Sequence, residues 1–454
     1  MQRRRFVGCI GAFMLAAPSL APSTQATAAE VSAVTPQVLV IGAGLAGLAA
    51  ARELQARGVD VVVLEGRKRI GGRIWTSTKW PDLPLDLGAS WIHGVQGNPL
   101  TTLANTIKAP RVITSYDNSQ TYNTAGKPLS DAEMARLDRL HEQVQQLIEA
   151  AQQAEQDRSV RQAMAPLIAN GSPETLRYLD FILNGTIEHE YAGRADQLSV
   201  YWYDSAKAFP GDDAIFRQGF HVISEYLAKG LRIELGQIVR RIDWSASPVR
   251  VVTNQREYRA DHVLITLPLG VLQAGQIQYT PALPSAKQRA IAALGMGVLN
   301  KCYLRFAEPF WPDDVDWLEY IPSKYGEWTE WVSFLRTANM PVLLGFNAAE
   351  QGRAIEALSD RQIVASALQT LRIMYGQKIP NPIDYQITRW ASDPFALGTY
   401  SFNPVGSHPR MRQELAKPVA QQLFFAGEAT EHEYFATAHG AYRSGLRAAQ
   451  EILR

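Results

Sequence analysis

The stretch from residue 37 to residue 73, "QVLVIGAGLAGLAAARELQARGVDVVVLEGRKRIGGR", constrains the fold more than any other part of the chain. It contains a short apolar run, a glycine-rich turn, an alanine-rich segment that stops at Gly58, and a second apolar run, "VDVVVLE". Continuous apolar runs of this length are typical of parallel strands buried on both faces. The order predicts a βαβ unit, and with it an α/β fold with a doubly wound parallel sheet.

The glycine-rich turn also predicts a ligand. Gly42, Gly44 and Gly47 form a G-x-G-x-x-G pattern between the predicted strand and helix. Such glycines allow a tight turn, let a pyrophosphate approach the backbone, and let the helix pack closely on the strand. Glu65 ends the next strand, where a carboxylate can hold the hydroxyls of a ribose. The pattern favours a dinucleotide site, and the alternative is a glycine-rich turn in a generic α/β domain.

Composition excludes some functions. The chain has 454 residues, 20% of them charged, and a net charge of +1. That length is enough for two domains. No basic stripe interrupts the sequence, so we expect no nucleic-acid partner. The two cysteines, Cys9 and Cys302, form no disulfide framework if the N-terminus is removed.

The N-terminus has the pattern of an export signal. Basic residues are followed by an apolar stretch and then by small residues, which predicts a signal peptide over residues 1–29. Arg3 and Arg4 resemble the pair of the twin-arginine signature, and the alternative is an ordinary secretory signal. We therefore expect a bacterial protein that is exported to the periplasm or secreted. No later apolar run reaches roughly 18 residues, so we expect no stable membrane anchor.

Other segments carry clear helix and strand patterns. Residues 130–168 show apolar residues at helical spacing after a capping box of Ser130 and Glu133. From residue 231 the pattern changes to strands. A helix is predicted over 359–375, a strand over 422–425, and a final helix from about residue 437.

Several separated motifs resemble the flavin-containing amine oxidases, the family of monoamine and polyamine oxidases. They are "LEGRKRIGGRIWT", "DLGASWIHG", "RQGFHVISEYLAKGLRIELGQIVRRI", "LGMGVLNKCYLRF", "RWASDPFALGTYS" and "FFAGEATEHEYFATAHGAYRSGLRAA". They are closest to the polyamine and spermine oxidases. The resemblance implies an FAD-binding domain over 34–92, 206–284 and 400–454. An interleaved α+β substrate-binding domain would cover 93–205 and 285–399.

The resemblance also implies the cofactor contacts. Arg73 would neutralise the pyrophosphate, Glu428 would accept hydrogen bonds from the ribityl chain, and the helix near Thr437 would point at the flavin. Thr399 stands where monoamine oxidases carry the cysteine that bonds to FAD, so non-covalent FAD is expected. The full expected set is Gly42, Gly44, Ala46, Gly47, Glu65, Gly66, Arg67, Gly72, Arg73, Gly88, Ala89, Ser90, Trp91, Val239, Trp390, Gly427, Glu428 and Thr437.

For the reacting end, the resemblance implies that Lys301 and Tyr400 are catalytic. Lys301 matches a lysine that reaches flavin N5 through a water, and Tyr400 matches one wall of an aromatic cage. Thr437 replaces the second cage tyrosine and opens the cage for a longer amine.

His93 and Glu190 match substrate-binding residues of polyamine oxidases. The alternative for His93 is a loop histidine whose hydrogen bonds are satisfied within the protein, and the alternative for Glu190 is a solvated surface acid. Glu188 and Glu190 would share one face if their segment is extended. We expect no metal site, and we expect residues 431–433 to form an exposed loop.

The expected function is oxidation of an amine C–N bond by hydride transfer to flavin N5. The imine is then hydrolysed to aldehyde and amine, and O₂ is reduced to H₂O₂. A polyamine is the favoured substrate. The alternatives are a secreted monoamine or alkaloid-amine oxidase or dehydrogenase, which would use O₂ or a redox carrier, and a non-catalytic flavin-containing binding protein. The sequence predicts no oligomeric state.

Overall fold

The computed structural model describes residues 37–454. The predicted signal peptide lies outside these residues. Within them, none of the helices combines the length and the apolar character needed to cross a membrane.

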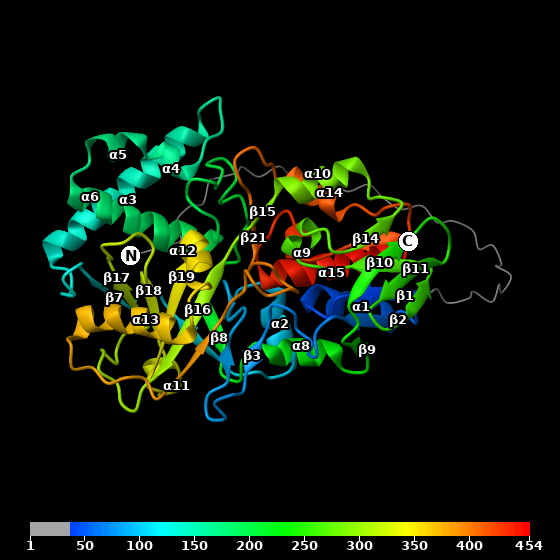
Figure 1. Cartoon of the computed structure of the whole chain (residues 1–454), viewed down its shortest axis with the longest axis horizontal. Coiled ribbons are helices and arrows are strands. Elements are labelled where there is room, and N and C mark those ends of the chain that lie inside the picture. Colours follow the sequence, from blue (N-terminus) through cyan, green and yellow to red (C-terminus); the bar gives the residue numbers. More distant parts are fainter. Residues whose placement is uncertain (1–36) are drawn as a thin grey trace, which may run out of the picture.

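A five-stranded parallel sheet forms one half of the molecule (Figure 1). Its strand order is β22-β13-β1-β2-β9, and every neighbouring pair is parallel. The strands are β1 (Gln37–Ile41), β2 (Asp60–Glu65), β9 (Arg232–Leu235), β13 (His262–Ile265) and β22 (Leu423–Phe425). The predicted parallel sheet of an α/β fold is confirmed, and strands far apart in the sequence complete it.

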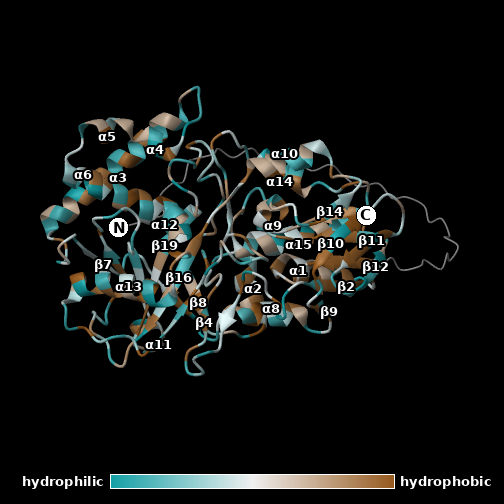
Figure 2. Cartoon of the chain, viewed as in Figure 1, coloured by the Kyte–Doolittle hydropathy of each residue, from teal (hydrophilic) through white to brown (hydrophobic). Residues whose placement is uncertain are grey.

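The two faces of this sheet are covered differently. Val38 and Val40 of β1 face helices, whereas Leu39 and Ile41 face the opposite side. The helices on the first face are α1 (Leu45–Ala56), α2 (Pro99–Thr106), α8 (His221–Ala228) and α15 (Ala438–Ile452). A second sheet covers the other face and consists of β10 (Val239–Asp243), β11 (Val249–Thr253), β12 (Glu257–Ala260) and β14 (Gln278–Thr280). Figure 2 shows hydrophobic colouring concentrated on these sheets.

A six-stranded sheet forms the other half of the molecule (Figure 1). Its order is β20-β16-β19-β18-β17-β7, antiparallel except for the pair of β17 and β7. The strands are β7 (Ser119–Tyr122), β16 (Leu299–Arg305), β17 (Trp317–Tyr320), β18 (Glu330–Ser333), β19 (Val342–Ala348) and β20 (Asp384–Ile387). Alternate residues of β16 enter different cores, because successive side chains on a strand point to opposite faces.

Helices flank the second sheet. α13 (Asp360–Tyr375) packs on one face, and it begins at Ser359 with a capping box. The helix predicted over 130–168 is shorter: α3 (Asp131–Gln152) has the predicted capping box, but it ends at Gln152. Two short helices follow, α4 (Val160–Ala163) and α5 (Ala165–Asn170). The apolar spacing continues across this break, which is why the pattern overestimated the helix.

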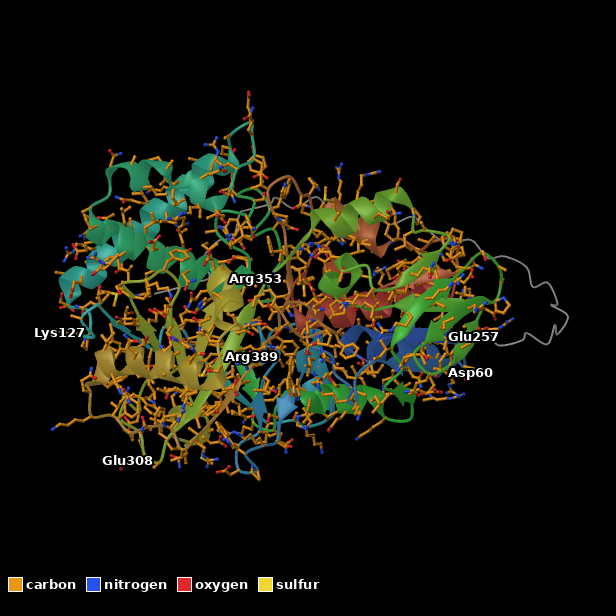
Figure 3. The ribbon with its side chains drawn as sticks, in the orientation of Figure 1. Asp60, Lys127, Glu257, Glu308, Arg353 and Arg389 are labelled. Atoms are coloured by element: carbon orange, nitrogen blue, oxygen red, sulfur yellow. The ribbon has the colours of Figure 1, made fainter. Side chains whose placement is uncertain are left out.

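The remaining elements are short and belong neither to the three larger sheets nor to the helices described above. The helical ones are α6 (Pro173–Ile182), η1 (Leu183–Glu188), α7 (His189–Tyr191), α9 (Leu269–Gln273), α10 (Ser285–Ala293), α11 (Leu335–Ala338), α12 (Ala349–Ile355), α14 (Arg410–Ala416) and η2 (Glu428–Thr430). The strands are β3 (Thr76–Ser77), β4 (Leu85–Asp86), β5 (Trp91–Ile92), β6 (Arg111–Thr114), β8 (Asp213–Phe216), β15 (Gly295–Met296) and β21 (Ser401–Phe402). Figure 3 shows charged side chains such as Asp60, Lys127 and Glu308 at the periphery.

Candidate active site

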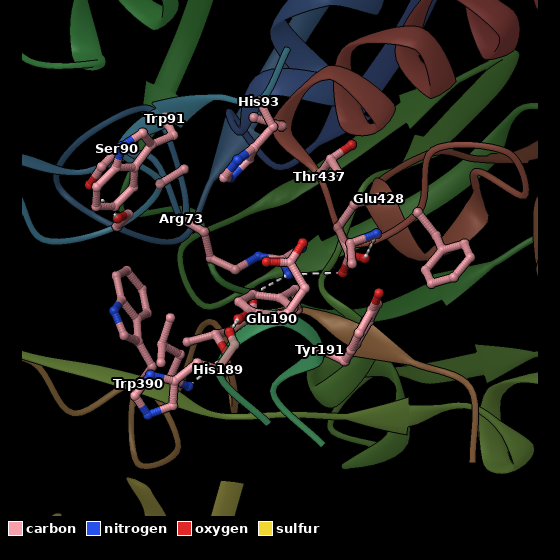
Figure 4. Close-up of a pocket in the computed structure, with 18 of the residues that line it drawn as sticks. Arg73, Ser90, Trp91, His93, His189, Glu190, Tyr191, Trp390, Glu428 and Thr437 are labelled. Carbon is pink, nitrogen blue, oxygen red and sulfur yellow. Dashed lines mark hydrogen bonds and ion pairs between the residues drawn. The ribbon is translucent and has the colours of Figure 1, made fainter. Parts of the chain in front are cut away.

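A cavity of about 1470 Å³ runs from the carboxyl edge of the parallel sheet to the six-stranded sheet. Both halves of the molecule line it, and α3 lines its outer part. Every predicted cofactor residue except Gly47 lines this cavity, as do Lys301, Tyr400, His93 and Glu190. Figure 4 shows several of these side chains in the cavity. The fold therefore gathers the predicted site residues at one place, although their roles stay predictions.

The glycine turn is shaped for a phosphate group. Gly42 has a φ of +108°, which a residue with a side chain rarely adopts. A Cβ on Gly47 would lie 2.0 Å from the Gly42 carbonyl oxygen, so the helix packs too closely on the turn for any side chain. Gly44 borders open space, and no side chain caps the start of α1. The free N–H groups of this helix end suit an anion, and these residues fit the pyrophosphate of a dinucleotide.

Glu65 is held at the end of β2 by backbone donors. The N–H of Ala43 donates to one carboxylate oxygen at 2.9 Å, and the N–H of Arg67 donates to the other at 2.8 Å. The carboxylate is buried at the cavity wall, where a ribose would lie if the phosphates occupy the α1 terminus. Arg67 forms two hydrogen bonds to Asp393 at 2.8 and 2.7 Å, so its guanidinium is fixed beside the cavity.

Arg73 and Glu428 form the polar centre of the cavity (Figure 4). Arg73 donates from one nitrogen to the Thr399 carbonyl at 2.7 Å and to Glu428 at 2.9 Å. Glu428 also accepts from the Ser401 hydroxyl at 2.7 Å and from the Ala436 N–H at 3.1 Å. Burial opposes its ionisation, but Arg73, Ser401 and other partners hold the pKa of Glu428 below its usual value. A charged carboxylate is therefore available to cofactor hydroxyls.

Lys301 is enclosed by the segment that follows β4. Its Nζ donates to the carbonyls of Asp86 at 2.8 Å and Gly88 at 2.7 Å and to the Ser90 hydroxyl. Burial lowers the pKa of Lys301 to about 7, and the nearby charge of Asp86 opposes the shift. Cys302 points to the opposite face of β16, into the core beside α13, as the alternation of a strand predicts.

Aromatic side chains form the walls around Lys301. Trp91 lies beneath its ammonium at 5.6 Å, and Trp390 donates its Nε1–H to the Leu87 carbonyl at 3.0 Å. Val239, the first residue of β10 in the covering sheet, also borders the cavity. The Tyr400 hydroxyl donates to the His189 carbonyl at 2.7 Å, so the orientation of this ring is fixed. Thr437 caps α15 by accepting from the Gly440 N–H at 2.9 Å.

The predicted substrate residues differ in exposure. His93 lies 2.9 Å from Asp213 and is partly exposed to the cavity. Glu190 is exposed on the cavity wall, whereas Glu188 is buried away from it. Glu188 accepts from the Asn184 amide and the Ala195 N–H, both at 2.9 Å, and burial raises its pKa. The segment is helical, spanning η1 and α7, so the condition under which these acids would share one face is not met.

The loop at residues 431–433 is less exposed than we expected. His432 is exposed, but Glu431 is buried and Glu433 pairs with Lys207. The expectation of an exposed loop is therefore wrong at Glu431, because Arg443 of α15 approaches both of the acids that flank His432. Within residues 37–454, no group of three or more His, Cys, Asp or Glu side chains could hold a metal ion.

Sequence reasoning missed several residues of the cavity wall. Glu319, Glu330 and His189 line it and are buried, and His189 Nδ1 lies 2.6 Å from Glu330. Asp204 also lines it and accepts a hydrogen bond from Tyr191, and burial raises the pKa of Asp204 to about 6. A signal was present for the two glutamates, because each is an acidic residue within or beside an aromatic-rich run, "WLEY" and "TEWVSF".

The fold and the cavity together define an α/β protein with a dinucleotide-binding turn at one end of a large cavity that both halves of the molecule line. A family model described as flavin containing amine oxidoreductase matches residues 45–453. The chain therefore belongs to this family, and the predicted family and FAD cofactor are confirmed.

Curated relatives support this assignment. Polyamine oxidase 3 of Oryza sativa subsp. japonica is 34% identical over 439 residues, covering 92% of this chain and 89% of the relative. Lysine-specific histone demethylase 1 homolog 1 of the same plant is 34% identical over 445 residues, covering 92% of this chain. The chain spans only 52% of that relative's length.

A solved structure shows the same fold. Wild-type putrescine oxidase bound to putrescine has a TM-score of 0.76 and 22% sequence identity. The match covers 92% of this chain and 99% of the other.

Proposed function

We propose that this protein is an FAD-dependent oxidase of polyamines. The observation that carries the proposal is the composition of the cavity beyond Lys301. Glu190, Asp204, Glu319 and Glu330 line it together with aromatic walls. Carboxylates and aromatic faces both attract ammonium groups, so the chamber suits a molecule with several positive charges. The relatives named polyamine oxidases support the same assignment.

The glycine turn, Glu65, Arg73 and Glu428 would hold FAD, which would supply the acceptor for a hydride equivalent from the carbon next to the reacting nitrogen. The chain's own residues orient the reactants. The fixed ring of Tyr400 supplies an aromatic face for the amine, and Trp91 and Trp390 exclude water from the chamber. The N-terminus of α15 directs its positive end into the cavity, where it stabilises negative charge. Lys301, with its pKa of about 7, can hold or release a proton near neutral pH.

FAD is held without a covalent bond in this proposal. The single cysteine within residues 37–454, Cys302, is buried and does not line the cavity. Thr399 occupies the position at which related monoamine oxidases attach the flavin, and its hydroxyl contacts backbone groups of 297 and 299. Acid precipitation of the yellow protein should leave all flavin in the supernatant, and flavin in the pellet would contradict this.

The test of the proposed function is anaerobic addition of amines to the purified flavoprotein. We expect spermine and spermidine to bleach the flavin absorbance, and the rate of bleaching to rise from pH 6 to 9. The sign follows because hydride loss requires a neutral amine, and amines of this kind have pKa values of about 10. In the same experiment, Lys301→Met should slow reoxidation by O₂.

Two outcomes would contradict the proposal. Bleaching by phenylethylamine alone would favour a monoamine oxidase, and no bleaching by any amine would favour a flavin-containing binding protein.

We also propose export through the N-terminal segment, on the basis of its sequence pattern. Replacement of Arg3 and Arg4 by lysine should then retain the protein in the cytoplasm of a bacterial host, and unchanged export would contradict the twin-arginine assignment.

A further inference from the structure

Arg412 of α14 is a fully buried arginine that lies behind the cavity wall. None of its surface is exposed (0%), and it does not line the cavity. Its Nε donates to the Asn403 side chain at 3.1 Å, and one terminal nitrogen donates to the Ser401 hydroxyl at 2.6 Å. The guanidinium also lies 3.9 Å from the centre of the Phe435 ring. A buried charge of this kind is costly unless an opposite charge lies nearby.

The Ser401 hydroxyl connects Arg412 to that opposite charge, the carboxylate of Glu428. It accepts the hydrogen bond from Arg412 and donates its own proton to Glu428 Oε2 at 2.7 Å. Hydrogen bonds in such a chain polarise and strengthen one another. The other oxygen, Oε1, accepts from Arg73 at 2.9 Å. Each oxygen of Glu428 is therefore held by a different arginine, one directly and one through a hydroxyl.

These two arginines differ in their relation to the cavity. Arg73 lines it and follows β2, whereas Arg412 belongs to α14 and lies outside it. Burial opposes the ionisation of Glu428, but both arginines and the Ser401 hydroxyl hold the pKa of Glu428 below its usual value. Burial lowers the pKa of Arg412 to about 10, and the charge of Glu428 opposes that shift. Arg412 therefore stays charged near neutral pH.

The titratable side chains of α15, which packs against the same loop, have other partners. Arg447 and Arg443 pair with acids other than Glu428, and His439 lies 3.3 Å from the Asn98 amide. The charge of Glu428 is thus set mainly by Arg73 and by the buried guanidinium of α14.

Arg412 also supports two segments of the cavity wall. Ser401 directly follows Tyr400, and Phe435, which lines the cavity, lies two residues before Thr437. Loss of the guanidinium would therefore have two separable effects, one on the charge of Glu428 and one on the packing of the wall.

We propose that Arg412 is a positioning residue for FAD, which through Ser401 keeps Glu428 ionised and fixed as an acceptor for cofactor hydroxyls. The proposal goes beyond the oxidation of polyamines, because it concerns how the cofactor is retained and holds whichever amine is oxidised.

The proposal makes FAD binding depend on pH in a defined direction. Because the pKa of Glu428 is lowered in the folded protein, its charge is present above that pKa and is lost as the pH falls through it. Without Arg412 the pKa rises, so the loss of charge moves to higher pH. Weakly acidic solution should then release FAD from the variant before it releases FAD from the wild-type protein.

Arg412→Met tests this dependence, because it removes the charge and keeps a long side chain. We expect its Kd for FAD to rise by about 10-fold or more between pH 8 and pH 5.5, and that of the wild-type protein by less than about threefold. Arg412→Lys keeps the charge and should restore most of the wild-type profile. Dilution of the holoprotein, ultrafiltration and assay of free FAD measure the Kd at each pH.

Two further variants separate charge from packing. Arg412→Met should add no pH dependence in a Glu428→Gln background, because the group that titrates is gone. The matched control is Lys287→Met. Lys287 is another buried basic residue packed against α14, where it donates to the carbonyls of Leu415 and Lys417, and it does not line the cavity. Its variant should keep the wild-type ratio of Kd values.

An Arg412→Met protein with the wild-type ratio of Kd values would overturn the proposal, as would a pH dependence that persists in the Glu428→Gln background. The same rise in Lys287→Met would also overturn it, since it would indicate a general loss of packing. If Arg412→Met does not fold, Ser401→Ala decides, because it keeps both charges and removes the bridging hydroxyl. Its ratio should also rise, and an unchanged ratio would overturn the proposal. A wild-type protein that binds FAD but oxidises no amine would contradict the proposed function alone.

Discussion

Asp86 connects several residues around the reacting end of the cavity. Its carboxylate accepts from the Thr76 hydroxyl and the Phe220 N–H, and its carbonyl accepts from Lys301 and from Tyr303. Burial raises the pKa of Asp86 to about 6 from an ordinary value of 3.8. The residue is therefore an anchor for the segment that encloses Lys301, and its ionisation costs free energy near neutral pH.

The free-energy cost of ionising the buried Asp86 predicts that Asp86→Asn changes the stability of the protein in a pH-dependent way. Because the folded pKa is raised, the native state binds more protons than the unfolded state between pH 4 and 6, and the wild-type protein loses stability as the pH rises through 6. The difference in the free energy of unfolding between Asp86→Asn and wild type should therefore shift by about 2 kcal/mol in favour of the variant as the pH rises from 4.5 to 7.5. Urea unfolding of both proteins at pH 4.5 and at pH 7.5 measures this shift.

Asp82→Asn is the matched control for this measurement. Arg305 holds the pKa of the exposed Asp82 below its usual value. The wild-type protein should therefore become more stable relative to Asp82→Asn as the pH rises. A difference between wild type and Asp86→Asn that is constant with pH would contradict the assigned shift.

At the scale of the element, α1 and the turn before it form the predicted phosphate-binding end of the cavity. The helix packs on β1 through Gly47 and opens toward the cavity at Gly44. The two glycines therefore serve different purposes, since one allows packing and the other leaves room for the ligand.

Substitution of the two glycines should separate fold from cofactor. Gly44→Ala is compatible with the backbone φ of −77°, so the protein should fold normally but bind FAD poorly, because the new methyl group occupies cavity space. Gly47→Ala should lower the free energy of unfolding by about 3 kcal/mol or more, because its Cβ overlaps a backbone oxygen. Thermal unfolding of the FAD-free proteins and their flavin content after reconstitution distinguish the two. Full flavin content in a stable Gly44→Ala protein would contradict the prediction.

At the scale of the whole molecule, one ion pair joins the two halves beside the predicted cofactor site. Arg67 follows β2 of the parallel sheet, and Asp393 follows the six-stranded sheet, 326 residues later. Their bidentate contact keeps only 12% and 17% of the two side chains exposed. The contact thus joins distant parts of the chain beside the predicted nucleotide site.

Loss of this pair should cost more than loss of a surface pair. Asp393→Asn removes the charge but keeps an oxygen for the Phe395 N–H, so we expect a loss of about 1–3 kcal/mol. Glu174→Gln breaks the exposed pair with Arg136 and should cost less than about 1 kcal/mol. Thermal unfolding at one fixed FAD concentration compares the loss of stability in Asp393→Asn with the loss in Glu174→Gln. Equal losses would show that Arg67 and Asp393 are no more coupled than surface residues.

Much of the molecule was predictable from local patterns. The first βαβ unit, the capping box at Ser130 and the final helix follow from short-range chemistry, because strand burial, helix capping and glycine turns depend on residues close in sequence. The break after Gln152 was missed, since apolar spacing alone does not mark where a helix ends.

The sequence by itself determined the family and the cofactor, and it predicted residues that the fold places around one cavity, because these depend on motifs whose chemistry is local. Only the tertiary structure decided the far wall of the chamber. Glu319 and Glu330 became direct neighbours through strand register, and His189 reached Glu330 from a helical segment that the sequence left open. Register and long-range packing arise from the whole fold, so no short stretch of sequence contains them.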